Sequence, residues 1–161
     1  MSVRFLANPP RCELHATVSI AAATTVTLTW DTSTLDFDPS NPTTAVWLPS
    51  PSTTITVPTA GRYAWSMQYE VLWSSTPSPS RGAFARALSQ PSGTSIGFYR
   101  AGPYPVVSGP TGVAACMSGQ TYLDPTGVSA DSGISLLSRN EATALVLNGD
   151  VYLQMCWIAE D

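Results

Sequence analysis

The segment Gly93 to Gly97 (GTSIG) is the stretch of this sequence whose spacing best matches a catalytic motif. A Gly-x-Ser-x-Gly pattern forms a nucleophile elbow when it lies on a strand-to-helix turn and when a histidine follows the serine along the chain. The one histidine, His15, lies far upstream of Ser95, and no helical pattern follows Gly97. We therefore expect no catalytic residue and a protein that is not an enzyme.

Two groups of side chains have the chemistry of metal ligands but not the number of ligands that a site needs. Cys12 and His15 have the spacing of half a zinc site, whereas structural zinc sites use four ligands and no second pair is nearby. Asp31, Asp36 and Asp38 lie in one segment and could bind calcium through carboxylate oxygens. Asp is also a common turn residue, so a solvated turn is the favoured interpretation. We expect no metal site and no cofactor.

The elements that would position these side chains are short β-strands. Runs of alternating apolar and polar residues recur along the chain, and no segment keeps a 3.6-residue period. The 14 Pro and 11 Gly cluster between these runs, a pattern typical of an all-β sandwich or barrel. The predicted strands are residues 16–22, 24–30, 44–48, 53–57, 63–73, 81–88, 95–99, 113–117, 120–123, 134–137, 142–147 and 150–158.

Two connections between these strands have specific predictions. Residues 31–40 are expected to form an acidic loop around Phe37. Asn148 and Gly149 are expected to form a hairpin turn, because both residues tolerate the positive φ that such a turn requires.

Residues 63–73 (YAWSMQYEVLW) form the longest predicted strand and alternate without a break. Successive side chains of a strand point to opposite faces, so one face of this strand is aromatic and apolar and the other is nearly uncharged. We expect the apolar face to lie in the core. Its predicted core residues are Tyr63, Trp65, Met67, Tyr69 and Val71.

The composition is poor in charge. Only 11% of the residues are Asp, Glu, Lys or Arg, compared with about 25% in an average soluble domain. Such a surface suggests that other protein covers much of it, and the alternative is a neutral Ser- and Thr-rich surface that is soluble without charges. The net charge of −4 and the scattering of the seven arginines along the sequence argue against a nucleic-acid partner.

The sequence gives no signal for a membrane or for secretion. No apolar run approaches the ~20 residues of a membrane helix, and the first residues (MSVRFLANPPR) lack the apolar core of a signal peptide. The odd number of cysteines predicts reduced thiols. We expect synthesis in a host cytoplasm and no membrane association.

Several motifs occur in an order that resembles one known family. Val57-Pro58 and Gly61-x-Tyr63 lead into the long strand, Trp30-Asp31 and Phe37-Asp38 precede it, and Leu145 to Leu153 (LVLNGDVYL) lies near the end. This order is similar to that of the complement globular-head and tumour-necrosis-factor-like (TNF-like) jelly-roll family, of the kind found in tailed-bacteriophage virion proteins.

The resemblance implies an antiparallel two-sheet jelly roll that assembles as a homotrimer. The nearly uncharged face of residues 62–72 would suit a subunit interface. We expect an extended N-terminal arm at residues 1–13 and the jelly roll at residues 14–161. Because relatives have a further strand after the Gly-Asp hairpin, we expect another segment to supply the last strand.

We therefore expect a structural protein of a bacteriophage virion, acting without catalysis as a trimeric decoration protein on the capsid exterior. Its partners would be copies of itself and the major capsid protein or another virion protein. The alternatives are a receptor-binding tip of a tail fibre or baseplate and a secreted module that binds a ligand or carbohydrate. The expected partner contacts of the arm are Arg4, Phe5, Leu6 and Arg11, since Asn8-Pro9-Pro10 bars a helix and an interior strand position.

Overall fold

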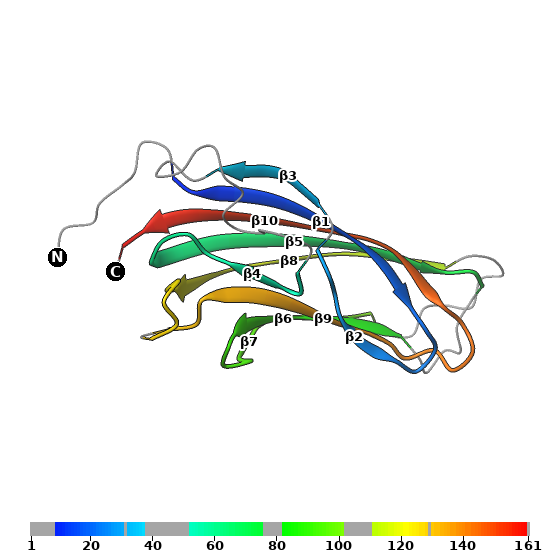
Figure 1. Ribbon diagram of the computed structural model, residues 1–161. Helices are drawn as coiled ribbons and strands as arrows, with labels where there is room; N and C mark the ends of the chain where they lie inside the picture. Colours follow the sequence, from blue (N-terminus) through cyan, green and yellow to red (C-terminus); the bar gives the residue numbers. More distant parts are fainter. Residues whose placement is uncertain are drawn as a thin grey trace.

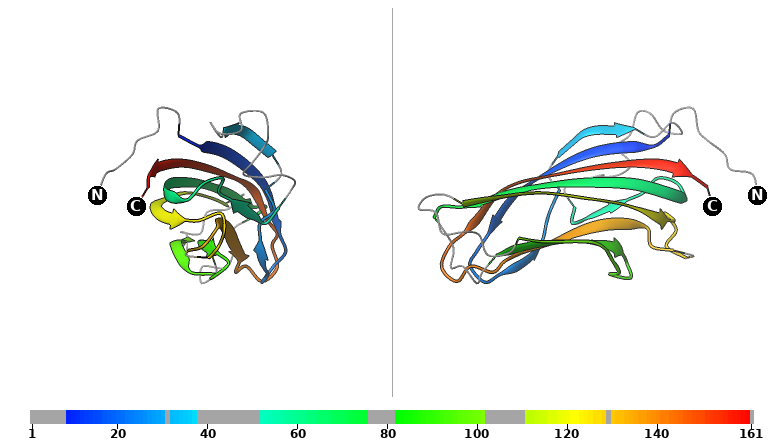
Figure 2. Two further views of the ribbon diagram at one scale, coloured as in Figure 1. Left: turned by 60° about the vertical axis from the view of Figure 1, so that its left-hand side comes forward. Right: turned by 180° about the vertical axis from the view of Figure 1, so that it is seen from behind.

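The computed structural model describes residues 9–30, 32–37, 52–75, 82–101, 111–128 and 130–160, which contain no helix and form two antiparallel sheets packed face to face (Figures 1 and 2). The predicted all-β two-sheet sandwich is confirmed. Sheet A has the spatial order β3 (Thr32–Phe37), β1 (Arg11–Ile20), β10 (Leu147–Ala159), β5 (Gly61–Trp73) and β8 (Thr111–Leu123). Sheet B has the order β2 (Thr25–Thr27), β9 (Gly133–Asn140), β6 (Ala83–Gln90) and β7 (Ser95–Ala101), and β4 (Thr54–Thr56) also pairs with β9.

The aromatic face of β5 lies between the sheets. All five predicted core positions on this strand are at most 3% exposed. The neighbouring strand β10 repeats the alternation and buries Val151, Leu153, Met155 and Trp157. Burial of large apolar side chains is the main favourable contribution to folding, so these two central strands supply much of the core.

Buried hydrogen bonds join the central strand of sheet A to sheet B. The hydroxyl groups of Tyr69 and Ser138 lie 2.7 Å apart. The indole Nε1–H of Trp73 donates to Oδ1 of Asn140 at 3.0 Å. Because Tyr69 and Trp73 belong to β5 and the other two residues belong to β9, these bonds fix the position of one sheet relative to the other.

Three parts of the predicted strand pattern differ from the structure. Residues 142–146, expected in a strand, are in none, and β10 begins at Leu147. Residues 32–37, expected as part of an acidic loop, form β3, which pairs with the first half of β1, from Arg11 to His15, along its outer edge. The predicted strands 113–117 and 120–123 are one strand, β8. Ser118-Gly119 resembles a turn in sequence, but a Cβ atom at Gly119 would lie 2.8 Å from Cζ2 of Trp65. This glycine therefore leaves room for a core indole.

The predicted hairpin at Asn148-Gly149 is wrong. Both residues lie inside β10, which pairs with β1 on one side and β5 on the other. A Cβ atom at Gly149 would lie 2.0 Å from the carbonyl oxygen of Glu70, so this position requires glycine because two backbones approach closely, and not because the chain turns. Strand β10, with this Gly-Asp pair inside it, therefore lies between β1 and β5 in the middle of sheet A.

The first strand begins earlier than expected. Strand β1 starts at Arg11, and the carbonyl of Pro10 accepts a hydrogen bond from Trp157 N–H at 2.9 Å. The expected boundary between arm and jelly roll, after residue 13, therefore falls inside β1. Residues 1–8 and the predicted strand at 44–48 lie outside the described part of the chain.

Substituting Trp65 by alanine should destabilise the sandwich by about 3–5 kcal/mol, the usual cost of removing a large buried aromatic side chain. The indole packs against Gly97 of β7 and Gly119 of β8, so its loss opens a cavity between the two sheets. Chemical denaturation of Trp65→Ala measures the change. Val128→Ala, at an apolar side chain that is 88% exposed in the turn after β8, is the control and should change stability little. Equal losses in both variants would contradict the burial of Trp65.

Stability should fall at alkaline pH because of Tyr69. Burial raises the pKa of Tyr69 from 10.0 to about 12, with the Ser138 hydrogen bond acting in the opposite direction. Between these two values the unfolded chain loses the phenolic proton while the folded chain keeps it, so unfolding becomes more favourable as pH rises, by roughly 2–3 kcal/mol in all. Denaturation from pH 9 to 12 should reveal this loss in the parent and a smaller one in Tyr69→Phe. Parallel pH profiles would contradict it.

Candidate functional site

The outer face of sheet A is the candidate site. It is built from the outward side chains of β1, β10, β5 and β8, which lie side by side in this order. Two large apolar side chains are exposed on it, Leu72 at 47% and Tyr152 at 45%. The outward residues of the two inner strands are Arg62, Ala64, Ser66, Gln68, Glu70 and Leu72 on β5, and Asn148, Asp150, Tyr152, Gln154, Cys156 and Ile158 on β10.

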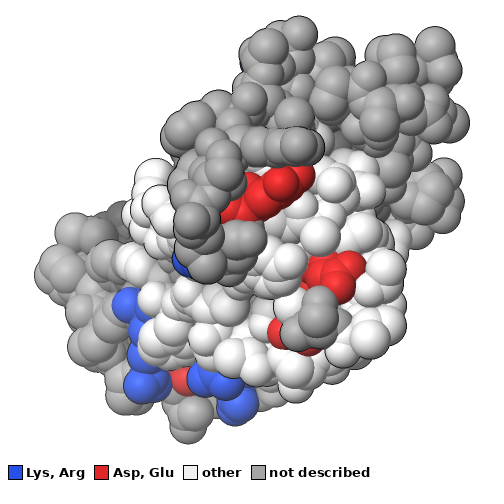
Figure 3. Space-filling model, turned by 90° about the vertical axis from the view of Figure 1, so that its left-hand side faces the viewer, with Lys and Arg blue, Asp and Glu red and all other residues white. Residues whose placement is uncertain are grey.

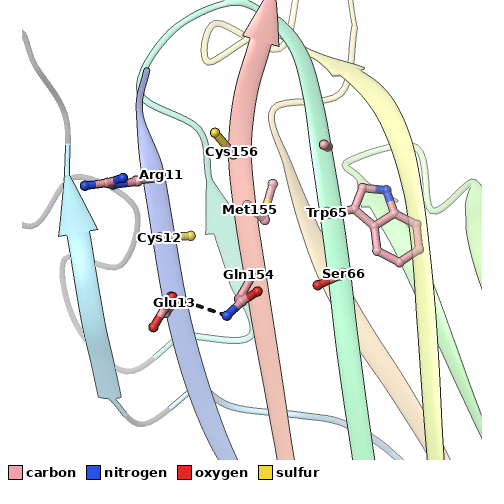
Figure 4. Close-up of a pocket in the computed structure, with 9 residues that line it drawn as sticks. Arg11, Cys12, Glu13, Trp65, Ser66, Gln154, Met155 and Cys156 are labelled. Atoms are coloured by element: carbon pink, nitrogen blue, oxygen red, sulfur yellow. Dashed lines mark hydrogen bonds between the residues drawn. The ribbon is translucent and has the colours of Figure 1, made fainter. Parts of the chain in front are cut away.

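A hollow of about 300 Å³ lies near the end of this face where β10 finishes (Figure 4). Small side chains on β5, Ala64 and Ser66, leave the space open between longer neighbours. Gln154 Nε2 donates to Glu13 Oε1 at 3.2 Å and links β10 to β1 at its rim. Burial raises the pKa of the Cys156 thiol, and the nearby Arg11 guanidinium opposes this shift.

A second hollow, of about 390 Å³, lies toward the other end of the face, and Gly112, Ala114 and Gly149 are among its lining residues. Glu70 and Asp150 are direct cross-strand neighbours there, an arrangement that is unfavourable between two carboxylates.

His15 lies beside the second carboxylate. Its Nε2 donates to Asp150 Oδ1 at 2.7 Å, and its ring lies 5.0 Å from the ring of Tyr152. This hydrogen bond orients Asp150 toward β1. A protonated His15 also offsets the negative charge of the Asp150 carboxylate.

Neither hollow contains the arrangement of a nucleophile and a base. Ser95 lies at the start of β7 in sheet B, whereas His15 lies on sheet A and is bound to Asp150. The glycines around Ser95 have structural explanations: Gly93 has a φ of +73° in the turn before β7, and Gly97 packs against Trp65. The described geometry gives Ser95 no catalytic partner.

The predicted metal ligands do not converge in the described part of the molecule. Cys12 points into the core and His15 points outward, because residues three apart on a strand lie on opposite faces. Asp36 belongs to β3, while Asp31 and Asp38 lie outside the described residues. The described residues contain no group of three His, Cys, Asp or Glu that could hold a metal ion, and their three cysteines form no disulfide with one another.

The expected partner contacts of the arm lie mostly beyond the described chain. Arg4, Phe5 and Leu6 fall in residues 1–8, which the structure does not describe. Arg11 is the first residue of β1 and lines the first hollow. The structure therefore places Arg11 on the same face as the outward side chains of β5.

Sequence reasoning missed a second surface, on the outer face of sheet B. Arg86, Arg100 and Arg139 are scattered along the sequence but lie on the neighbouring strands β6, β7 and β9. Figure 3 shows basic side chains gathered on the lower side of the molecule, where sheet B lies, with a carboxylate among them. The alternation of each strand could have assigned a face to each arginine, but only the sheet order brings the three together.

Comparison with known structures identifies the fold of this chain, and comparison with known sequences finds no relative. No protein-family model and no curated protein matches the sequence. The structure of murine APRIL at pH 8.5 matches with a TM-score of 0.54 and 12% identity over 94% of this chain and 100% of that one. Murine APRIL at pH 8.0 matches with a TM-score of 0.54 and 14% identity over 92% and 99% of the chains.

A third similar structure is PRD1 vertex protein P5, with a TM-score of 0.48 and 12% identity over 92% of this chain and 96% of that one. Among the described residues, no helix has the length and apolar character needed to cross a bilayer.

The match to APRIL and the two-sheet topology identify the fold of this chain as the TNF-like jelly roll.

Proposed function

We propose that this protein is a structural component of a bacteriophage virion, a trimeric decoration protein on the capsid exterior that acts by burying surface and without catalysis. Its partners are copies of itself and the major capsid protein or another virion protein. The phage assignment is supported by the order of sequence motifs around Gly61, Tyr63 and Gly149, which is similar to that of phage virion jelly rolls.

The observation that carries the proposal is the outer face of sheet A. This face combines small side chains, two exposed apolar side chains and two hollows that projecting groups of a neighbouring subunit would fill. A surface that combines exposed apolar residues with polar side chains is typical of a protein interface. A closed ring with three-fold symmetry would cover such a face on every subunit.

Two other functions use the same fold. A receptor-binding tip of a tail fibre or baseplate would also form a trimer, and a secreted binding module would use its loops for a ligand or carbohydrate. The decoration role is favoured because the candidate surface is a broad sheet face suited to another protein subunit, and not an enclosed pocket for a small molecule.

The self-association can be tested with one substitution on each sheet. Light scattering should give the parent about three times the 17.0 kDa mass of the chain. Ser66→Glu should give a monomer, because burying an unpaired carboxylate at an interface costs several kcal/mol. Thr27→Glu is the matched control, an exposed hydroxyl position on sheet B, and should leave the mass unchanged.

The outcome that contradicts the trimer is a parent of 17.0 kDa at micromolar concentration. A trimer that persists in Ser66→Glu but dissociates in Thr27→Glu would place the interface on sheet B and contradict an interface on sheet A. Thermal unfolding of each variant separates loss of assembly from loss of folding.

The virion role is tested on intact particles. Gold-labelled antibody against this protein should mark the capsid exterior in electron micrographs of the phage that encodes it. Label on the tail would favour the receptor-binding alternative, and particles without label would refute a virion role.

The arm belongs to the same proposal, with Arg4, Phe5, Leu6 and Arg11 as contacts to a virion partner. Because Pro10 takes part in the pairing with β10, a deletion should stop at residue 8. A chain without residues 2–8 should melt close to the parent and fail to bind particles that lack the protein. A large drop in melting temperature would instead assign the arm to the fold of the domain.

A further inference from the structure

The outer face of sheet B contains an alternating array of arginine and apolar side chains. Across the sheet, Phe84 of β6 has Arg139 of β9 and Arg100 of β7 as its direct neighbours. One step along β6, Arg86 has Leu137 and Phe98 as its neighbours. Each guanidinium group therefore has an apolar side chain directly opposite it, and no two of these arginines are direct cross-strand partners.

The aromatic rings hold this array together. The guanidinium carbon of Arg86 lies 5.3 Å from the ring centroid of Phe98, within the range of a cation–π interaction. The ring centroids of Phe84 and Phe98 are 5.8 Å apart at an interplanar angle of 42°. Phe98 is nevertheless 53% exposed. A ring this exposed, supported by neighbours and surrounded by guanidinium groups, has the character of a contact residue at a protein interface.

The charge of this face is opposite to that of the whole protein. The chain has a net charge of −4, yet three of its seven arginines lie here. Arg100 is paired with Glu141, with two oxygen contacts at 3.1 and 3.3 Å. Arg86 and Arg139 have no ion pair with any described residue and are exposed. Two guanidinium groups thus remain available to an incoming anion.

From this array we infer that the outer face of sheet B is a binding surface for an acidic protein segment, one that presents Asp or Glu carboxylates beside an apolar side chain. Arg86 and Arg139 bind the carboxylates, and Phe98 receives the apolar group. Guanidinium groups suit this partner because their planar donors bind a carboxylate through two parallel hydrogen bonds. The inference depends neither on a viral origin nor on a trimer.

A nucleic-acid partner fits these observations less well. A phosphate backbone is bound by many cations in a row, and its affinity falls steeply when contacts are few. This face offers two arginines without an ion pair among the described residues, fewer cations than a phosphate backbone is usually bound by.

The test uses fluorescent poly-L-glutamate and a glutamate–tyrosine copolymer as probes, titrated with the full-length protein at low salt. The parent should bind both, and the copolymer more tightly. The double variant Arg86→Gln/Arg139→Gln should bind at least about tenfold more weakly, as expected when hydrogen bonds to charged groups are lost. Phe98→Ser should remove the preference for the copolymer. Ser74→Glu/Ser75→Glu, at two exposed residues directly after β5, changes the net charge by the same amount, is the control and should bind nearly as tightly as the parent.

Three results would overturn the inference. The parent could fail to bind either polymer. Ser74→Glu/Ser75→Glu could weaken binding as much as Arg86→Gln/Arg139→Gln, which would indicate a general charge effect. An oligothymidylate of equal charge could also bind more tightly than the glutamate polymers, which would favour a nucleic-acid surface. Circular dichroism melting of every variant establishes that each is folded, and light scattering on the same samples keeps changes of assembly separate from changes of binding.

Discussion

The amide group of Asn140 is the polar contact on which the arrangement of the two sheets depends. The residue is completely buried at the end of β9 in sheet B. Its Oδ1 accepts from the indole of Trp73 in sheet A, and its Nδ2 donates to the carbonyl groups of Ile20 and Leu145. An unpaired amide in this environment would cost several kcal/mol. The core is therefore stable only when sheet A, sheet B and the segment before β10 are all folded against Asn140.

The aromatic side chains of β5 surround this contact and set the spacing of the layers. Trp65 extends from sheet A to Gly97 on β7, where there is no Cβ atom to obstruct it. Trp73 and Tyr69 reach β9 through hydrogen bonds. Because the side chains of β5 alternate strictly, committing one face to the core leaves the other face of small and polar residues outside, where two hollows form.

The two outer faces of the sandwich have different chemistry. Sheet A presents small side chains, exposed Leu72 and Tyr152, and a carboxylate pair oriented in part by His15. Sheet B presents arginines that alternate with aromatic rings. A surface of the first kind favours association with a neutral, shape-complementary subunit, and one of the second kind favours an acidic partner. On the two proposals made for these faces, a single jelly roll would contact two different partners at once.

The sequence by itself determined the class of fold and the core face of β5, because alternation and residue type are local properties that a strand preserves. The tertiary structure decided three things that depend on contacts distant in sequence. Gly149 is a strand residue because the backbone of Glu70 lies against it, residues 32–37 are a strand because β1 offers an unpaired edge, and Arg86 and Arg139 form one surface because β6 pairs with β9. In each case the deciding partner lies far away along the chain, and local pattern contains no information about which strands will become neighbours.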